Sequence, residues 1–236
     1  MMMRKFLRQI LTIAISAALM LTLAACSEPT DPGSEGTPTN TTATKRSEAN
    51  KMTGEITIKL FPELAPVAVA TFIKAAEDGY YSGKIFHRII EDFMIQGGSP
   101  NGDGIGSAPE YEQYDTEPSP HAKHLYGALS TANTGMPKSN GQQFFIVSTQ
   151  HTDWLDGKHT VFGHTVDGFD LLDTLGVIKT SNHRPVNQVT IESVTINTFS
   201  GGDDPTENSI KGNVGGDVKL ENGDKYAVIT ISYTPD

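Results

Sequence analysis

The chain has 236 residues with a formal net charge of −10, so it is long enough for one domain of ordinary size plus appendages. An acidic chain argues against nucleic acid and anionic membrane surfaces as partners, because both require basic patches. The single cysteine, Cys26, excludes a disulfide within the chain.

The first 25 residues differ from the rest of the sequence. Three basic residues stand among the first eight, and a mostly apolar run over 10–25 follows. This order is typical of a secretory signal. The run is short for a membrane span, which needs about 20 apolar residues, although an N-terminal transmembrane anchor stays open as an alternative.

The end of the apolar run, Leu23-Ala24-Ala25-Cys26, resembles the lipobox of bacterial lipoproteins. The resemblance implies a signal peptide over 1–25 and lipidation of Cys26, which would anchor the protein stably to the cell membrane of a bacterium, outside the cytoplasm. Residues 26–50 are rich in Thr, Ser, Pro, Gly and Asn and lack large apolar side chains. We expect them to form a disordered tether, because such a segment cannot bury enough surface to offset the entropy of ordering.

Ordered structure is expected from about Glu55. Apolar and polar residues alternate over 55–60, which predicts a half-buried strand. Pro66 is suited to the first turn of a helix, and Gly79 to its end. Four apolar residues would share one face of that helix: Val69, Phe72, Ile73 and Ala76.

The next elements are mainly short strands. We expect them over 85–90, 93–96, 144–148, 160–162 and 189–199, with a second helix over 169–175. Many short strands, turns rich in Gly and Asn, and only two helices favour an antiparallel barrel or a sandwich. The pattern alone leaves both open.

The sequence Ser-Gly-Gly-Asp-Asp-Pro after Phe199 predicts a break, followed by a C-terminal extension over 200–236. Within it, Asn222-Gly223 lies between extended runs over 218–220 and 226–233, which is typical of a β-hairpin. We expect this hairpin to pack on the domain.

Three longer segments carry the chemistry of the chain. They are FHRIIEDFMIQGG over 86–98, NGQQFFI over 140–146 and WLDGKHTVFG over 154–163. In this order they resemble the signature segments of cyclophilins, which are peptidyl-prolyl cis-trans isomerases. The resemblance covers about 55–198 and implies, for a domain over 51–199, a mainly β fold: a closed eight-stranded antiparallel barrel capped by two α-helices.

Rotation about an X–Pro peptide bond meets a barrier of about 20 kcal/mol because of amide resonance. No covalent bond breaks, so neither a nucleophile, a metal nor a cofactor is needed. A cation that donates a hydrogen bond to the prolyl nitrogen stabilises the twisted state, where the nitrogen lone pair becomes available. The resemblance implies that Arg88 is this catalytic cation, with a rigid fork of donors, and that Gln96 orients it.

The resemblance also implies a set of substrate-binding residues around Arg88. An apolar pocket that includes His159 would receive the proline ring. The side chain of Gln143 and the backbone at Asn133 would bind the peptide backbone. Trp154 matches the tryptophan associated with cyclosporin binding. The matching residues are Phe93, Met94, Ala132, Asn133, Thr134, Gln143, Phe145, Trp154, Leu155 and His159.

The chain departs from the family pattern in two places. Thr131 and Thr134 stand where the family often has Met and Ala, and they could narrow or polarise the subsite beside the proline pocket. The family usually opens with a strand before the one at Glu55, where tether-like sequence stands here. We hypothesise that the C-terminal hairpin takes the place of that strand.

Other functions are less well supported by the residues. His121 with His124, or His159 with His164, could meet on a helix, but their segments look like loop and strand, and no HExxH pattern occurs, so no metal is expected. Ser130 or Ser148 as a nucleophile would lack a Gly-x-Ser-x-Gly elbow.

The expected partners are therefore unfolded or flexible polypeptides that contain proline, with cyclosporin as a possible ligand and no nucleic acid. We expect a monomer that assists the folding of secreted or surface proteins, in which proline isomerisation is a slow step. The alternative is a tethered binding module or chaperone that grips proline-containing segments without isomerising them.

Overall fold

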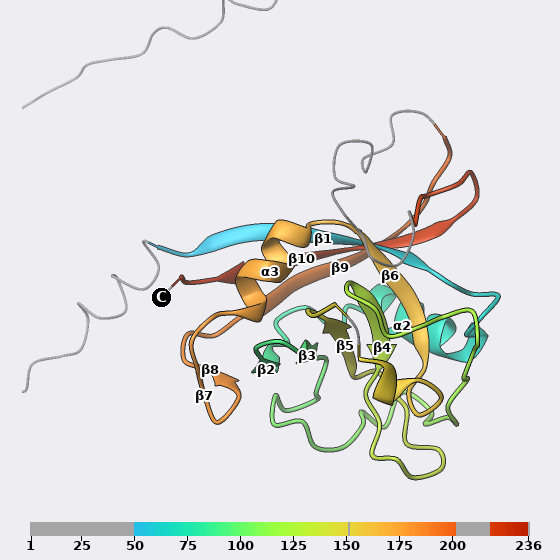
Figure 1. Cartoon of the computed structure of the whole chain (residues 1–236), viewed down its shortest axis with the longest axis horizontal. Helices are drawn as coiled ribbons and strands as arrows, with labels where there is room; N and C mark the ends of the chain where they lie inside the picture. The colour runs from blue at the N-terminus through green and yellow to red at the C-terminus, as the bar shows by residue number, and fades with distance from the viewer. Residues whose placement is uncertain (1–49, 151, 202–217, 236) are drawn as a thin grey trace, which may run out of the picture. The chain divides into compact units, whose positions relative to one another are not determined.

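The computed structural model describes residues 50–150, 152–201 and 218–235, all within one unit formed by residues 40–236 (Figure 1). The predicted signal peptide, Cys26 and nearly all of the predicted tether lie outside the described residues. In the described part of the chain, no helix combines the length and apolar character that crossing a membrane requires.

The elements run in chain order as β1 (Met52–Leu60), α2 (Pro66–Glu77), β2 (Phe86–Ile90), β3 (Met94–Gly97), β4 (Ala128–Thr131), β5 (Phe144–Val147), the 3-10 helix η1 (Asp153–Leu155), β6 (Val161–Asp167), α3 (Phe169–Gly176), β7 (Thr180–Ser181), β8 (Arg184–Pro185), β9 (Thr190–Thr198) and β10 (Lys225–Tyr233).

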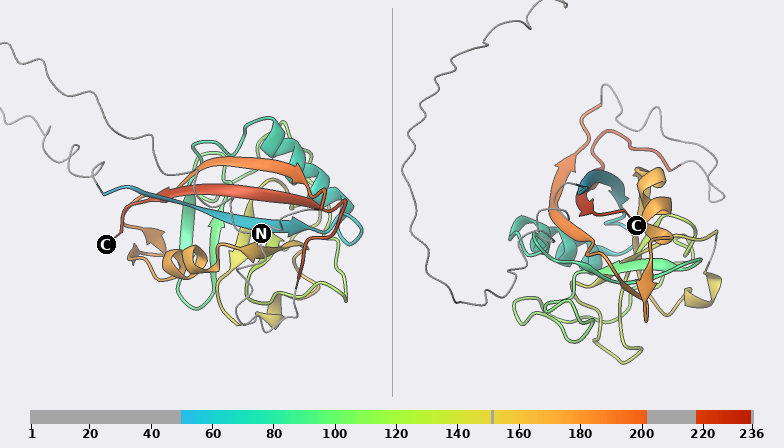
Figure 2. Two further views of the ribbon diagram at one scale, coloured as in Figure 1. Left: turned by 90° about the horizontal axis from the view of Figure 1, so that it is seen from above. Right: turned by 90° about the vertical axis from the view of Figure 1, so that its left-hand side faces the viewer.

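Eight of the strands form one antiparallel sheet in the order β2-β3-β5-β4-β6-β1-β10-β9, and the sheet curls strongly (Figure 2). The expectation of a closed barrel is wrong. The edge strands β2 and β9 share no continuous ladder; an isolated bridge between Ile85 and Thr190 lies at that seam, with a few hydrogen bonds around it. The sheet is therefore a half-barrel.

The C-terminal strand β10 is a full member of this sheet. It pairs along its length with β1, where Ile56 is opposite Ile229, and with β9, where Val194 is opposite Ile229. The turn forms at Asn222-Gly223 as expected, but residues 218–220 are not a strand. The antiparallel partners of β10 are β1 and β9. The extension therefore supplies a strand of the sheet beside β1, as hypothesised from the sequence, but it does so with one strand and not with a hairpin of its own.

Both predicted helices form, and each covers part of the curled sheet. α2 packs against β9, and its Phe72 ring lies 5.6 Å from the ring of Phe144 and 5.4 Å from that of Phe162. α3 follows Gly168, whose φ is +88°. A side chain at this position would place its Cβ 2.2 Å from the Glu55 carbonyl oxygen, so glycine is required for the close approach of α3 to β1.

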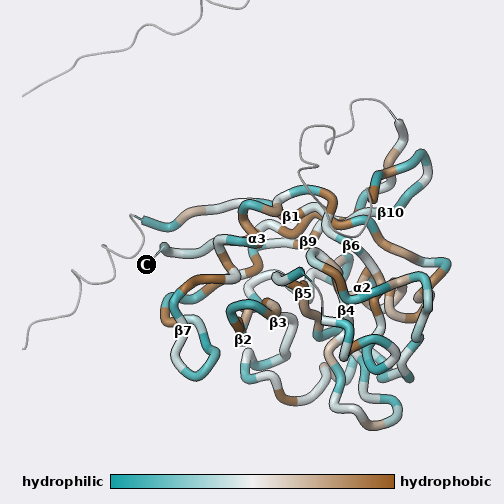
Figure 3. Tube along the Cα trace, viewed as in Figure 1, coloured by the Kyte–Doolittle hydropathy of each residue, from teal (hydrophilic) through white to brown (hydrophobic). Residues whose placement is uncertain are grey.

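Two separate apolar clusters form. The main core lies between the inner face of the sheet and the helices, and it includes Ile56, Ile58 and Phe72, which are at most 2% exposed. Figure 3 shows apolar residues recurring along the strands and helices. A smaller cluster around Met94 and Phe145 is built from β3, β4, β5 and β6, apart from the main core. The candidate site lies on this second cluster.

Candidate active site

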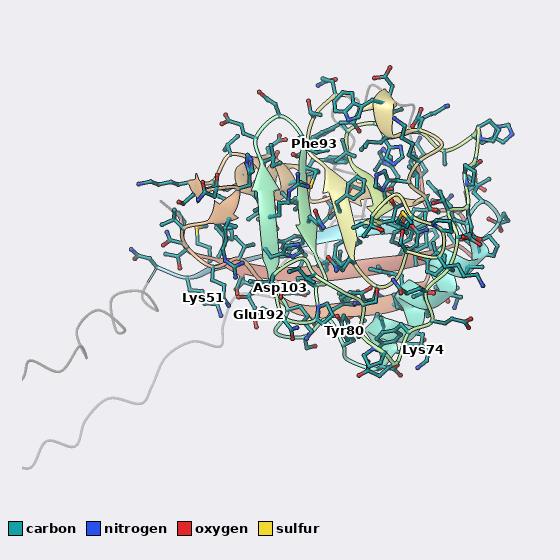
Figure 4. All side chains as sticks on the ribbon, turned by 90° about the horizontal axis from the view of Figure 1, so that it is seen from below. Lys51, Lys74, Tyr80, Phe93, Asp103 and Glu192 are labelled. Carbon is teal, nitrogen blue, oxygen red and sulfur yellow. The ribbon has the colours of Figure 1, made fainter. Side chains whose placement is uncertain are left out.

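The β2–β3 hairpin places a guanidinium beside an amide. Arg88 in β2 is opposite Gln96 in β3 in the strand register, and Arg88 Nη1 donates a hydrogen bond of 3.2 Å to Gln96 Oε1. The turn between the strands contains Asp92, at φ +54°, and Phe93, which Figure 4 labels. Among the described residues, no ion pair involves Arg88. Burial lowers the pKa of Arg88, but the usual pKa of a guanidinium is so high that the side chain stays charged at neutral pH.

Beside this guanidinium lies a pocket of about 290 Å³. Its walls come from β2, β3, β5, the end of β4, and the segment from η1 to β6. Nine of the expected site residues line it: Arg88, Phe93, Met94, Gln96, Ala132, Asn133, Phe145, Leu155 and His159. Chain segments separated by more than seventy positions in the sequence are thus brought to one pocket that has both apolar and polar walls and a cation at its edge.

The other three expected residues lie around the pocket and do not line it. Thr134 is exposed and lines a neighbouring hollow of about 710 Å³, which it shares with Asn133 and His159. Gln143 is buried, and its Nε2 donates to the Gly106 carbonyl at 2.7 Å. Trp154 is 55% exposed, and its ring centroid lies 5.9 Å from that of Phe93.

The two threonines that depart from the family pattern have different environments. Thr131 is buried, and its hydroxyl donates to Asn140 Oδ1 at 2.6 Å. Its side chain therefore belongs to the interior, and the expectation that it polarises the subsite is wrong. Thr134 remains exposed beside the pocket, so it is the threonine that a bound chain can reach.

Below the pocket lies a polar network that the sequence reasoning missed. His124 Nδ1 lies 2.8 Å from Asp156 Oδ1, and His124 Nε2 lies 2.9 Å from Ser130 Oγ. The His124 ring stacks on Phe145 with centroids 6.0 Å apart and an interplanar angle of 14°. His124 and Ser130 lie six residues apart, whereas Asp156 follows His124 by 32 positions, and no sequence motif relates the three.

The order serine, histidine, aspartate is that of a hydrolase triad, but the geometry excludes that chemistry at Ser130. The side chain is fully buried, and its hydroxyl oxygen lies 2.9 Å from both the Thr160 carbonyl oxygen and His124 Nε2, within the protein interior. A nucleophile must be accessible to a substrate carbonyl. In the described residues, no three His, Cys, Asp or Glu side chains gather as a metal site would require.

Two further histidines border the site. His159 Nδ1 lies 3.0 Å from the Thr131 carbonyl, so this nitrogen is assigned as the donor, and the ring stands edge-on to Phe145. His87, next to Arg88, is 6% exposed, and neither ring nitrogen has a hydrogen-bond partner. Burial, followed by the nearby Arg184 and Arg88 charges, lowers the pKa of His87 to about 4.

The site can hold a small apolar ring and direct hydrogen-bond donors at it. A ring seated against Met94 and Phe145 would meet the half-buried guanidinium of Arg88, which is oriented by a neutral acceptor and so keeps its full charge available. Nothing in this arrangement activates a nucleophile. The geometry fits a reaction that needs electrostatic stabilisation and no covalent step.

Comparisons with known proteins agree with this geometry. The model of the family described as cyclophilin type peptidyl-prolyl cis-trans isomerase/CLD matches residues 45–196. Proteins of Staphylococcus saprophyticus and Staphylococcus aureus that carry the name of a peptidyl-prolyl cis-trans isomerase are each 40% identical to the chain in an alignment 172 positions long. The match covers 61% of this chain and 87% of theirs.

The chain is also similar to solved structures. A crystal structure of a Cryptosporidium parvum cyclophilin type peptidyl-prolyl cis-trans isomerase, in the presence of the dipeptide Ala-Pro, has a TM-score of 0.56 and 35% identity to it. The match covers 60% of this chain and 92% of that chain. A second crystal structure of the Cryptosporidium enzyme has the same TM-score and identity, with 91% of that chain covered.

Proposed function

The chain belongs to the family of cyclophilin-type peptidyl-prolyl cis-trans isomerases, and from this premise we propose that it binds proline-containing polypeptides at the Arg88 pocket and isomerises them there. The observation that carries the proposal is the half-buried Arg88 guanidinium, hydrogen-bonded to neutral Gln96 at the edge of an apolar pocket.

The roles of the residues follow from what the twisted state needs. Met94 and Phe145 form apolar walls of a size that suits a prolyl ring, so the ring's desolvation holds it in place. As the peptide bond turns, the prolyl nitrogen becomes pyramidal and accepts a hydrogen bond from Arg88. This interaction is absent in the planar ground state, so it lowers the barrier without tightening substrate binding equally.

The test is an isomerase assay on a proline-containing tetrapeptide with three proteins: the wild type, Arg88→Ala and Arg88→Lys. We expect kcat/KM to fall at least 100-fold in Arg88→Ala, which corresponds to about 2.7 kcal/mol of transition-state stabilisation. Arg88→Lys keeps the charge but loses the planar fork, so its activity should stay low. Equal slow rates for all three proteins, with peptide binding retained, would instead establish a non-catalytic binding module.

The cellular role is a further part of the proposal. The signal-like segment over 1–25 and the lipobox-like Cys26 support a protein anchored by lipid outside the cytoplasmic membrane, where it would accelerate the folding of secreted or surface proteins. Growth with a labelled fatty acid should label the wild type and not Cys26→Ser, and the variant should leave the membrane fraction. Labelling of both proteins would contradict the anchor at Cys26.

Binding of cyclosporin is proposed from the same site. Trp154 is the single tryptophan of the chain and is 55% exposed beside Phe93. Its fluorescence should therefore change on titration with the compound, and Trp154→Ala should weaken inhibition of the isomerase. Undiminished inhibition of that variant would show that Trp154 does not take part.

A further inference from the structure

The pocket wall rests on a buried hydrogen-bond network. The ring of Phe145 lines the pocket and also stacks on the ring of His124, with the two ring centroids 6.0 Å apart. His124 is 1% exposed, and each of its ring nitrogens meets one polar partner: Asp156 Oδ1 at 2.8 Å and Ser130 Oγ at 2.9 Å. Both nitrogens of the His124 imidazole are thus hydrogen-bonded, while the ring itself stacks on Phe145, which lines the pocket.

The proton positions in this network follow from its donors and acceptors. Burial raises the pKa of Asp156, but the hydrogen bonds from His124 and Lys123 outweigh this and leave the pKa below its usual value. Asp156 is therefore an acceptor at neutral pH, and Nδ1 of His124 carries the proton. In the neutral ring Nε2 is then an acceptor, and the Ser130 hydroxyl is its donor.

A second acceptor competes for the same hydroxyl proton. The Thr160 carbonyl lies 2.9 Å from Ser130 Oγ, equal to the distance from Nε2. If His124 takes up a proton, Nε2–H becomes a donor to Ser130 Oγ, and the hydroxyl proton must turn to Thr160. Every polar atom is then still paired, so one proton switches the network between two complete arrangements.

Hydrogen bonds connect this network to the residues that line the pocket. The Thr160 carbonyl also accepts the Thr131 N–H at 2.9 Å, and the Thr131 carbonyl holds His159 Nδ1 at 3.0 Å. Thr131 directly precedes Ala132 and Asn133, which line the pocket. Protonation of His124 would also bring a second buried cation close to the site where Arg88 must act.

We propose that His124 is a positioning residue of the proline pocket: its neutral ring, held between Asp156 and Ser130, fixes Phe145 and His159 for catalysis, and protonation of this ring weakens catalysis. The inference rests on the proposed function of the Arg88 pocket and adds a residue that does not touch the substrate.

The charges around His124 make the inference testable. Burial lowers the pKa of His124, the hydrogen bond and charge of Asp156 act in the opposite direction, and His159 and Lys123 lower it further. The ring is therefore neutral at pH 7, and catalysis should decline below pH 6.5. We expect kcat/KM of the protonated enzyme to be of the order of tenfold lower, because small displacements of a site are costly.

Substitutions of Asp156 and Lys123 should shift the pH at which kcat/KM declines in opposite directions. Asp156→Asn removes the anion that favours the imidazolium, so the decline should shift to lower pH. Lys123→Gln removes a cation 3.2 Å from Asp156, so the decline should shift to higher pH. The Lys123 side chain is 49% exposed, and this variant should fold normally and keep wild-type activity at pH 8.

The experiment measures kcat/KM from pH 5 to 8 for the three proteins, with circular dichroism at each pH as the folding control. Nitrogen-15 NMR of the imidazoles titrates His124 and His159 separately, so the kinetic inflection can be assigned. Trp154 fluorescence gives the peptide dissociation constant over the same range. Kinetic inflections that follow the His124 titration in all three proteins would support the proposal.

Two outcomes would overturn the inference. One is a profile that stays flat, or rises, through the pH at which His124 titrates. The other is an inflection that follows His159 and ignores both substitutions. If the wild type shows no isomerase activity at any pH, the proposed function fails, and the pH dependence of peptide affinity in the three proteins then decides whether His124 positions the pocket.

Discussion

Arg88 keeps its catalytic potential because its partner is neutral. The Gln96 amide oxygen at 3.2 Å orients the guanidinium without cancelling its charge, and burial raises the strength of any hydrogen bond that the guanidinium donates. A carboxylate at position 96 would orient the Arg88 side chain equally well, but the carboxylate would hold the guanidinium in a charge-assisted ion pair. In the proposed mechanism, the amide therefore leaves the guanidinium free to turn towards the prolyl nitrogen.

The substitution Gln96→Glu tests this reasoning. At pH 7.5 we expect kcat/KM to fall about tenfold, or about 1.4 kcal/mol, with KM little changed because the apolar walls are untouched. The Arg88 charge lowers the pKa of the new carboxylate, which therefore stays ionised down to pH 5, so the difference from the wild type should persist between pH 5 and 8. Gln96→Leu is the matched control, since it removes the orienting acceptor without introducing a titrating group. A Gln96→Glu enzyme as active as the wild type at pH 7.5 would contradict the argument.

His87 affects stability through its buried, unpaired ring. Its pKa is about 4 in the folded protein and 6.5 in the unfolded chain. Between these values the unfolded state binds a proton that the native state does not, so the free energy of unfolding falls as the pH drops from 6.5 towards 4. The two values give a loss of up to about 3 kcal/mol from this residue.

We therefore expect His87→Leu to reduce the pH dependence of stability. Urea unfolding at pH 7 and pH 4.5 should show a smaller loss of stability in this variant than in the wild type. At pH 7 the substitution should cost little, because neither ring nitrogen has a partner to lose. His121, which is exposed, gives the control variant His121→Leu, and equal pH dependence in all three proteins would refute the assignment.

At the scale of elements, α2 depends on a residue far along the chain. The Glu117 carboxylate accepts hydrogen bonds from the backbone N–H groups of Val67 at 3.1 Å and Ala68 at 2.8 Å, at the helix N-terminus. The N-cap position, Ala65, has no side-chain hydrogen bond. Pro66 marked the start of the helix in the sequence, but the acid that caps it comes from a loop about fifty residues later.

The substitution Glu117→Gln should destabilise the protein by about 1 kcal/mol, since it removes a negative charge from the positive end of a helix while leaving one oxygen to accept. Thermal unfolding should show a lower melting temperature. Glu63→Gln is the control, because Glu63 is an exposed acid just before the same helix. Equal melting temperatures of the two variants would show that the cap contributes nothing.

Strand β4 shows why some elements escape sequence reasoning. All four residues from Ala128 to Thr131 are buried, so the strand has no alternation of apolar and polar positions to detect. β1, in contrast, buries Ile56 and Ile58 and presents Glu55 outward, and its pattern predicted a strand correctly. Alternation is readable only where one face of a strand meets solvent. The equally buried β5 was predicted from its run of large apolar residues, which β4 lacks.

At the scale of the whole molecule, the C-terminal strand holds the half-barrel together. β10 lies between β1 and β9, and Ala227, Ile229 and Ile231 are 0% exposed. Its Ser232 hydroxyl also donates to Glu192, which pairs with Lys51 at 2.8 Å; Figure 4 labels these two charged residues near each other. Without β10, both neighbouring strands would lose a complete ladder.

Deleting residues 200–236 should therefore abolish cooperative folding of the whole domain. Burial of each isoleucine contributes about 1.5–3 kcal/mol, and a domain of this kind has a net stability of about 5–15 kcal/mol. Circular dichroism melting is the measurement, with deletion of residues 235–236 as the control and Ile229→Ala as a milder variant expected to lower the melting temperature. A truncated protein that melts at the wild-type temperature would refute the role of β10.

The sequence by itself determined much of this protein. Local periodicity located both helices and most strands, and three long motifs identified the family and seven of the nine residues that line the pocket. Periodicity can be read from the sequence because it depends on residues only a few positions apart. The motifs can be read because each is a long continuous segment with many characteristic side chains.

Only the tertiary structure decided the rest. The open seam between β2 and β9, the place of β10 in the sheet, the buried side of Thr131 and the network behind Phe145 all depend on which distant strands pair. Which distant strands pair depends on how much apolar surface the whole sheet buries. The paired strands are not separated by any fixed number of residues, so the sequence gives no pattern to detect. The meeting of His124 and Ser130 with the distant Asp156 therefore could not be predicted from the sequence.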